Sequence, residues 1–273
     1  MTVAIVIPAR YASSRFPGKP LALLTGADGQ AKSLIQRSWE AAIAVPGVAQ
    51  VVVATDDGRI AEAAERFGAQ VVMTSETCRN GTERCADALP ALGDAEIVVN
   101  LQGDAPLTPP WFIEALIAAM TTRPEIEVAT PVLRCDRAAL DGFLADRRAG
   151  RVGGTTAVFD RTGRALYFSK EVIPYTGALD TSSKGAGSNP DAPLPVFHHV
   201  GVYAYRPSVL IAYAAMEDGP LERLEGLEQL RFMEQGHPVH CVEVDARGAG
   251  FWEVNNPEDI PRVERMLKER GLA

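Results

Sequence analysis

Short apolar runs alternate with amphipathic stretches along the first half of the chain. The apolar runs are rich in β-branched residues and predict buried strands at 3–8, 48–55, 69–74 and 95–104. Between and after them, apolar residues recur at helical spacing over 32–45, 58–68, 80–92 and 108–120. Strands separated by helices of this length pair in parallel through right-handed crossovers. The pattern therefore predicts an α/β domain of three layers with a mainly parallel sheet.

Polar residues and glycines mark the ends of the predicted helices. Ser33, Thr82 and Thr108 are candidate caps, because a hydroxyl at this position accepts from the first free backbone N–H groups of a helix. The last helix has Asn256 as its candidate cap, a proline directly after it, and Gly271 past its end. These signals predict helices with defined boundaries.

From about residue 127 the pattern changes to short strands separated by turns. We expect these strands at 128–133, 155–160, 165–169, 198–205 and 239–244. They indicate an antiparallel extension over 127–206, followed by a return to the main sheet over 207–273. Segment 176–193 is rich in Gly, Ser, Asp and Pro, and loops of this length are either functional lids or disordered. No linker divides the chain, so we expect residues 1–273 to form one domain.

Composition narrows the class of protein. The formal net charge is -8, from 35 acidic and 27 basic residues, which argues against a general nucleic-acid-binding protein. No apolar run is long enough to span a membrane, and no basic segment precedes the first apolar run. The four cysteines form no CxxC pair, so we expect reduced thiols and a cytoplasmic protein that binds no membrane.

Three cations follow the first predicted strand of this acidic chain. Arg10, Arg15 and Lys19 lie within ten residues, and like charges this close repel one another unless an anion neutralises them. Ligands of open parallel sheets bind at the carboxyl ends of the strands, which is where this loop lies. Neither GxGxxG nor GxxxxGK[ST] is present. The loop is therefore expected to bind a nucleoside triphosphate together with a divalent ion.

A carboxylate follows the fourth predicted strand at the same edge of the sheet. Asp104 comes directly after Gly103, which allows a sharp turn and close approach of a ligand. Mg²⁺ takes one or two protein oxygens beside phosphates and keeps waters. Asp104 is therefore a candidate Mg²⁺ ligand.

Blocks of sequence throughout the chain resemble the 3-deoxy-manno-octulosonate (Kdo) cytidylyltransferases. In order, the blocks are "IPARYASSRFPGKPL", "VVVATDD", "NGTERCADAL", "VVNLQGDAP", "ALYFSKEVIPY", "HHVGVYAYR", "PLERLEGLEQLR" and "VNNPEDI". The resemblance implies a Rossmann-like nucleotidyltransferase fold and a homodimer built through strands of the second half. It also implies Mg²⁺-dependent transfer of CMP from CTP to an acidic acceptor, by in-line attack on the α-phosphorus with release of diphosphate.

The same resemblance assigns roles to individual residues. Residues 1–126 are expected to bind the nucleotide, and about 127–206 to bind the acceptor and form the dimer. The expected catalytic residues are Arg15, Lys19 and Asp104. The expected nucleotide-binding residues are Arg10, Arg15, Lys19, Gly81, Thr82 and Gln102. The expected acceptor-binding residues are Lys170, His199, Tyr203 and Glu225.

The sequence departs from the family pattern mainly on the acceptor side. The second metal carboxylate of the family is replaced by Asn255, whose carbonyl oxygen can still ligate a hard cation; its alternative role is to cap the last helix. Thr156 and Lys170 stand where the family has Lys and Arg, and Arg to Lys loses a bidentate grip on a carboxylate.

Three alternatives therefore stay open beside a Kdo-type acceptor. The acceptor is a small phosphonate of a natural-product pathway, or the base is not cytosine, or the chain binds CTP without catalysis.

Overall fold

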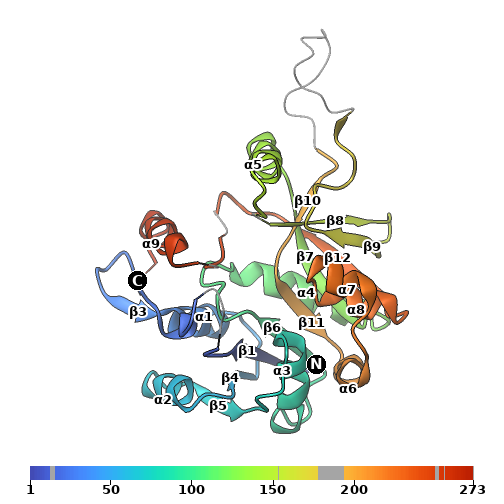
Figure 1. The fold of residues 1–273 in the computed structure, drawn as a ribbon. Helices are drawn as coiled ribbons and strands as arrows, with labels where there is room; N and C mark the ends of the chain where they lie inside the picture. Colours follow the sequence, from blue (N-terminus) through green and yellow to red (C-terminus); the bar gives the residue numbers. More distant parts are fainter. Residues whose placement is uncertain (13–15, 153, 178–193, 250–251, 255, 273) are drawn as a thin grey trace. The chain divides into compact units, whose positions relative to one another are not determined.

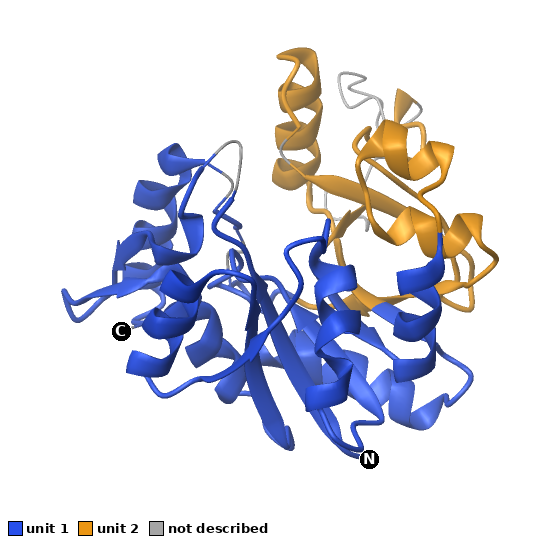
Figure 2. Ribbon diagram, turned by 60° about the horizontal axis from the view of Figure 1, so that its bottom comes forward, with its two compact units in different colours: residues 1–129, 201–216, 246–273 blue, residues 130–200, 217–245 orange. Residues whose placement is uncertain are grey.

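The computed structural model describes residues 1–12, 16–152, 154–177, 194–249, 252–254 and 256–272. They fall into two compact units, coloured separately in Figure 2. Unit 1 comprises 1–129, 201–216 and 246–273, and unit 2 comprises 130–200 and 217–245. None of the helices among the described residues combines the length and the apolar composition that a membrane-spanning helix needs.

The sheet of unit 1 follows the alternation of apolar runs in the sequence. Its strands are β1 (Val3–Ala9), β4 (Gln50–Thr55), β5 (Gln70–Met73), β6 (Ile97–Leu101) and β11 (Val202–Tyr205), with the first residues of β7 (Val128–Arg134). The spatial order is β5-β4-β1-β6-β11-β7, parallel from β5 to β6 and antiparallel at β11 (Figure 1). All seven residues of β1 are buried, as a central parallel strand with two covered faces requires.

Helices of unit 1 flank this sheet and pack on each other. They are α1 (Leu34–Ile43), α2 (Gly58–Arg66), α3 (Gly81–Ala88), α4 (Pro110–Thr122), α6 (Pro207–Ala215) and α9 (Ile260–Glu269), with short 3₁₀ turns η1 (Lys19–Leu21), η2 (Leu89–Ala91) and η4 (Pro257–Asp259). A small hairpin, β2 (Leu23–Thr25) and β3 (Ala31–Ser33), precedes α1. One apolar cluster contains Leu24, Leu34, Val254 and Val263. The last helix therefore packs against the hairpin and the start of α1.

Unit 2 is the antiparallel part of the chain. Its strands are β8 (Thr155–Phe159), β9 (Ala165–Ser169), β10 (Phe197–His199), β12 (Val239–Val244) and the remainder of β7; its helices are α5 (Arg137–Arg148), α7 (Pro220–Glu225) and α8 (Gln229–Glu234). The order is β7-β10-β8-β9, with β12 also paired to β7. The five strands expected after residue 127 are confirmed, the run 198–205 as the two strands β10 and β11.

Three local expectations were wrong. Asn80, not Thr82, caps α3, because its side-chain oxygen accepts from Glu83 N at 2.8 Å. Thr108 does not cap α4, which begins after Pro109 without a side-chain cap. Helix α5 lies in a region expected to hold only strands and turns. Its cap is Asp136, and Leu140 is the residue that it buries.

The remaining helix-end signals are confirmed. Ser33 accepts from Gln36 N at the start of α1, and Asn256 forms a reciprocal capping box with Asp259. Gly271 has φ 64° just past α9, a backbone conformation that glycine adopts at little cost.

Candidate active site

Lys19 and Asp104 meet at the carboxyl ends of two neighbouring parallel strands of unit 1. Lys19 Nζ lies 2.6 Å from Asp104 Oδ2, with side chains 17% and 24% exposed. Gly103 explains how the turn before Asp104 comes so close to β1, because a Cβ there would lie 2.9 Å from the carbonyl oxygen of Pro8. The loop before Lys19 is closed by Gly18, whose N–H donates to Tyr11 O at 3.0 Å. The structure therefore brings Lys19 and Asp104 into contact at the edge of the sheet where the sequence predicts both.

Glu253 adds a second carboxylate to this pair. The backbone of the next residue, Val254, donates to Asp104 O at 3.0 Å, so the two segments run side by side. Burial and the negative charge of Asp104 raise the pKa of Glu253 to about 7, against the opposing effects of Lys19 and of a hydrogen bond from the Gly201 backbone. The two carboxylates therefore lie close enough to repel each other, with the Lys19 ammonium acting on both.

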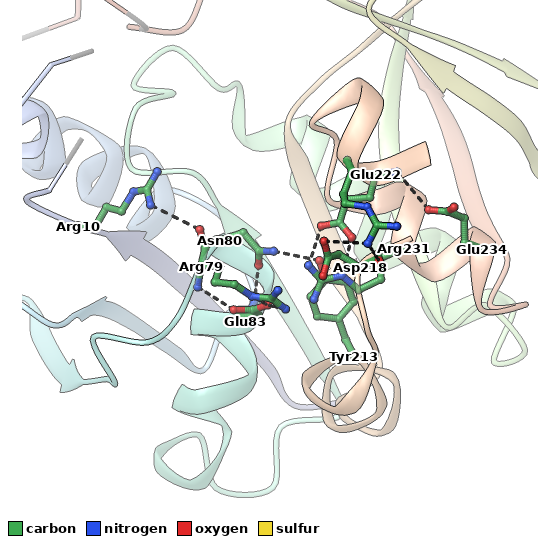
Figure 3. Close-up of polar contacts among 10 residues, drawn as sticks. Arg10, Arg79, Asn80, Glu83, Tyr213, Asp218, Glu222, Arg231 and Glu234 are labelled. Carbon is green, nitrogen blue, oxygen red and sulfur yellow. Dashed lines mark hydrogen bonds and ion pairs between the residues drawn. The ribbon is translucent and has the colours of Figure 1, made fainter. Parts of the chain in front are cut away.

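The start of α3 forms a second polar region of unit 1. Asn80 Nδ2 donates to the Tyr213 hydroxyl at 3.1 Å, and Arg10 reaches the carbonyl of Arg79 at 3.5 Å (Figure 3). Glu83 accepts from the backbone N–H of Arg79 at 2.7 Å. These contacts fix the residues before α3 beside the end of β1, and the N-terminal end of a helix favours anions.

Gln102 and Asn100 lie against the first turn of α3. A Cβ at Gly81 would lie 2.9 Å from Gln102 Nε2 and 3.2 Å from Asn100 Nδ2, so only glycine fits without displacing these amides. The buried Asn100 amide has no hydrogen-bond partner among the described residues. Thr82 is also buried, and its hydroxyl pairs with that of Tyr205 at 2.9 Å. Gly81 and Gln102 are thus adjacent, whereas Thr82 faces the packed interior.

In unit 2, Glu225 gathers donors from β9 and the turn after it. Its carboxylate accepts from Ser169 Oγ at 2.7 Å, from Lys170 N at 2.9 Å and from the Tyr167 hydroxyl at 3.4 Å. The Lys170 ammonium lies against Gly226, where a Cβ would approach it to 3.0 Å. The structure therefore brings together two of the four predicted acceptor residues, Lys170 and Glu225.

The other two predicted acceptor residues make their contacts elsewhere. The His199 ring in β10 is hydrogen-bonded with Thr130 Oγ1 at 3.0 Å and packs edge-on against Phe168. Burial lowers the pKa of His199 to about 3, so the ring is neutral. Tyr203 lies in β11 of unit 1, where it is 3% exposed and stacks on Tyr205.

Thr156 is occupied by the backbone of unit 2. Its hydroxyl donates to Glu171 O at 2.6 Å and accepts from Ile173 N at 3.1 Å. Thr156 therefore holds the turn after β9.

Two predicted site residues, Arg15 and Asn255, lie outside the described residues. Three further residues lie beside the predicted site residues and were not predicted from the sequence: Asn80, Asn100 and Glu253. For Glu253 a signal was present, because an acid between apolar neighbours precedes the expected ligand Asn255 by two positions.

An ammonium on a carboxylate at the ends of parallel strands, beside a helix start lined by two amide side chains, is typical of an α/β protein of the nucleotidyltransferase class. Residues 4–243 match the family Cytidylyltransferase. The chain is 44% identical over 272 residues to the 3-deoxy-manno-octulosonate cytidylyltransferase of Maricaulis maris, covering 99% of both chains. It belongs to the Kdo cytidylyltransferase family and is an enzyme of the cytidylyltransferase type.

Two further similarities bear on the acceptor and on the fold. The chain is 41% identical to the 8-amino-3,8-dideoxy-manno-octulosonate cytidylyltransferase of Shewanella baltica, covering 98% of this chain and 99% of that one. Among solved structures, CMP:2-keto-3-deoxy-manno-octonic acid synthetase complexed with CTP matches with a TM-score of 0.80 at 34% identity, over 99% of this chain and 100% of that one.

Proposed function

We propose that this protein transfers CMP from CTP to Kdo or a closely related ulosonic acid and releases diphosphate. The observation that carries the proposal is the Lys19–Asp104 pair at the strand ends of a chain from this family. The acceptor oxygen attacks the α-phosphorus in line, with no covalent enzyme intermediate. Catalysis then depends on positioning the reactants and on neutralising charge at the bridging and leaving oxygens.

The residues of unit 1 take the nucleotide in this proposal. Arg10 and Lys19 bind the triphosphate, together with Arg15 as the sequence predicts. Gly81 and Gln102 take the base and ribose, and the Gln102 amide packs directly on Gly81. The Thr82 hydroxyl supports this surface through Tyr205.

Asp104 is proposed to hold Mg²⁺, and the chemistry of the site fits this ion. The carboxylate already faces a cationic group at 2.6 Å, and it presents hard oxygen ligands. Within the described ranges, no group of three or more His, Cys, Asp or Glu side chains gathers. The phosphates would supply further ligands, as is usual for Mg²⁺, which in this role neutralises phosphate charge. Asn255 stays a predicted ligand from the sequence.

On the acceptor side, Lys170 is proposed to bind the carboxylate of the sugar acid. Glu225 holds the Lys170 backbone, and its carboxylate would accept from an acceptor hydroxyl. His199 and Tyr203 support the surrounding packing.

A cytoplasmic homodimer is the form that we propose for the protein. All four cysteines are free, which is usual for cytoplasmic proteins. Unit 2 exposes large apolar side chains, Leu166 at 59% and Leu224 at 82%, which a second copy of the chain would cover.

The test is diphosphate release from CTP with a panel of acceptors. We expect turnover with Kdo or 8-amino-Kdo in the presence of Mg²⁺, and none when UTP, GTP or ATP replaces CTP. Other ulosonates and small phosphonates complete the panel. Turnover with a phosphonate and with no ulosonic acid would show that the acceptor is a phosphonate. CTP binding without any product would refute catalysis.

A further inference from the structure

Glu253 lies beside the predicted cation site, and it has no role in the reaction proposed above. Its charge interacts with both Asp104 and Lys19. The Val254–Asp104 backbone hydrogen bond at 3.0 Å fixes the segment that carries it against the end of β6. Glu253 is therefore held next to Asp104 by backbone contacts.

Gly201 gives the Glu253 carboxylate a fitted place. The Gly201 backbone donates a hydrogen bond to it, and a Cβ at this position would lie 3.0 Å from Glu253 Oε1. A larger residue would push the carboxylate away, so the glycine keeps an anionic oxygen close to the backbone. The carboxylate is thus oriented by the protein before any ligand binds.

The charges around this carboxylate favour the binding of a further cation. With both carboxylates ionised, Asp104 and Glu253 would carry two negative charges against one positive charge on Lys19, which leaves one negative charge where an anionic triphosphate is expected. A divalent cation reverses that sign. Two carboxylates also match the number that Mg²⁺ usually takes from a protein beside phosphates.

We infer that Glu253 is the second carboxylate ligand of the divalent cation, paired with Asp104. This inference rests on the proposed Mg²⁺-dependent function. With a cation held by the two carboxylates, the Lys19 ammonium would contact the phosphates.

The inference is tested by the coupling between cation and nucleotide, measured by titration calorimetry without acceptor. The coupling is the ratio of the CTP dissociation constants in EDTA and in saturating Mg²⁺. We expect Glu253→Gln to reduce this ratio about tenfold or more, since even outer-shell partners of metal ligands change affinity by about 10- to 100-fold. In EDTA, the same variant should bind CTP as tightly as the wild type or more tightly, because a negative charge near the triphosphate is gone.

A reduced ratio without weaker CTP binding in EDTA distinguishes a metal ligand from a structural residue. Loss of a structural residue would weaken CTP binding equally in EDTA and in Mg²⁺. Glu258→Gln is the matched control: it removes the same charge from an exposed position in η4 and should change the ratio less than about twofold. Asn255→Ala is the competing variant.

Three results would overturn the inference. The first is an unchanged ratio in Glu253→Gln while Asp104→Asn loses its coupling, which leaves the proposed function intact. The second is loss of coupling in Asn255→Ala but not in Glu253→Gln. The third is a wild-type ratio near one, which refutes Mg²⁺ dependence itself. Thermal melts of every variant check that it is folded.

Discussion

Replacing Asp104 by Asn separates the chemistry of the site from the stability of the fold. The substitution keeps the shape of the side chain and removes its charge. We expect kcat/KM for diphosphate release to fall at least about 100-fold, because removing one group that stabilises developing charge typically costs about 10²- to 10³-fold. The loss should persist at saturating Mg²⁺ and CTP if Asp104 acts in the transition state.

The expected cost in stability is small. The Lys19–Asp104 pair is short, but its side chains are 17% and 24% exposed, so solvent screens much of the attraction. Exposed pairs contribute about 0.2 to 1 kcal/mol, whereas losing one partner of a fully buried pair costs about 3 to 5 kcal/mol. Glu253 further limits the loss, because it ionises more readily without Asp104 and can pair with Lys19. We expect about 1 kcal/mol, equivalent to a decrease in Tm of about 2 to 4 °C.

Two assays on the same preparation test both parts: coupled detection of diphosphate, and thermal unfolding followed by circular dichroism. Activity within a few-fold of the wild type would refute the role of Asp104 at the cation. A decrease in stability of more than about 3 kcal/mol would refute the conclusion that Asp104 serves the site rather than the fold.

Three further predictions concern the nucleotide surface and the stability of unit 2. Gly81→Ala should weaken CTP binding several-fold in calorimetry, because its Cβ displaces a neighbouring amide, whereas Gly58→Ala, at the first position of α2 in open space, should not change it. Glu222 accepts from Arg231 Nε and Nη2 at 2.6 Å each in a buried pair (Figure 3), so Glu222→Leu should lower the free energy of unfolding in urea by about 3 to 5 kcal/mol. Adding Arg231→Met should recover most of that loss, and an additive double variant would contradict the reasoning. The folded-state pKa of His199, about 3, lies below its unfolded value near 6.5, so its stabilising contribution is complete above pH 6.5 and is lost as the pH falls. Between pH 6 and 5 the free energy of unfolding should therefore fall about 1 kcal/mol more in the wild type than in His199→Asn, and equal slopes would contradict a neutral buried ring.

Much of unit 1 was predictable because its signals are local. The run Val3–Ala9 is long enough and apolar enough to indicate a strand buried on both faces, and the sheet confirms it. The meeting of Lys19 with Asp104 followed from a general property of parallel sheets, in which neighbouring strands end at the same edge. Helix α5 was missed because its single buried residue, Leu140, leaves a weak apolar period, and its cap alone was not enough.

The sequence by itself determined the order of strands and helices, the edge of the sheet that carries the charged groups, and the family. Only the tertiary structure decided which polar groups face one another. Asp104 and Glu253 are far apart in sequence and meet through a backbone hydrogen bond of the last segment, while Thr82 and His199 turn out to be packed in the interior. The physical reason is that hydrophobic periodicity acts over neighbouring residues, whereas the charge of a site sums over every segment that the fold brings within a few ångströms.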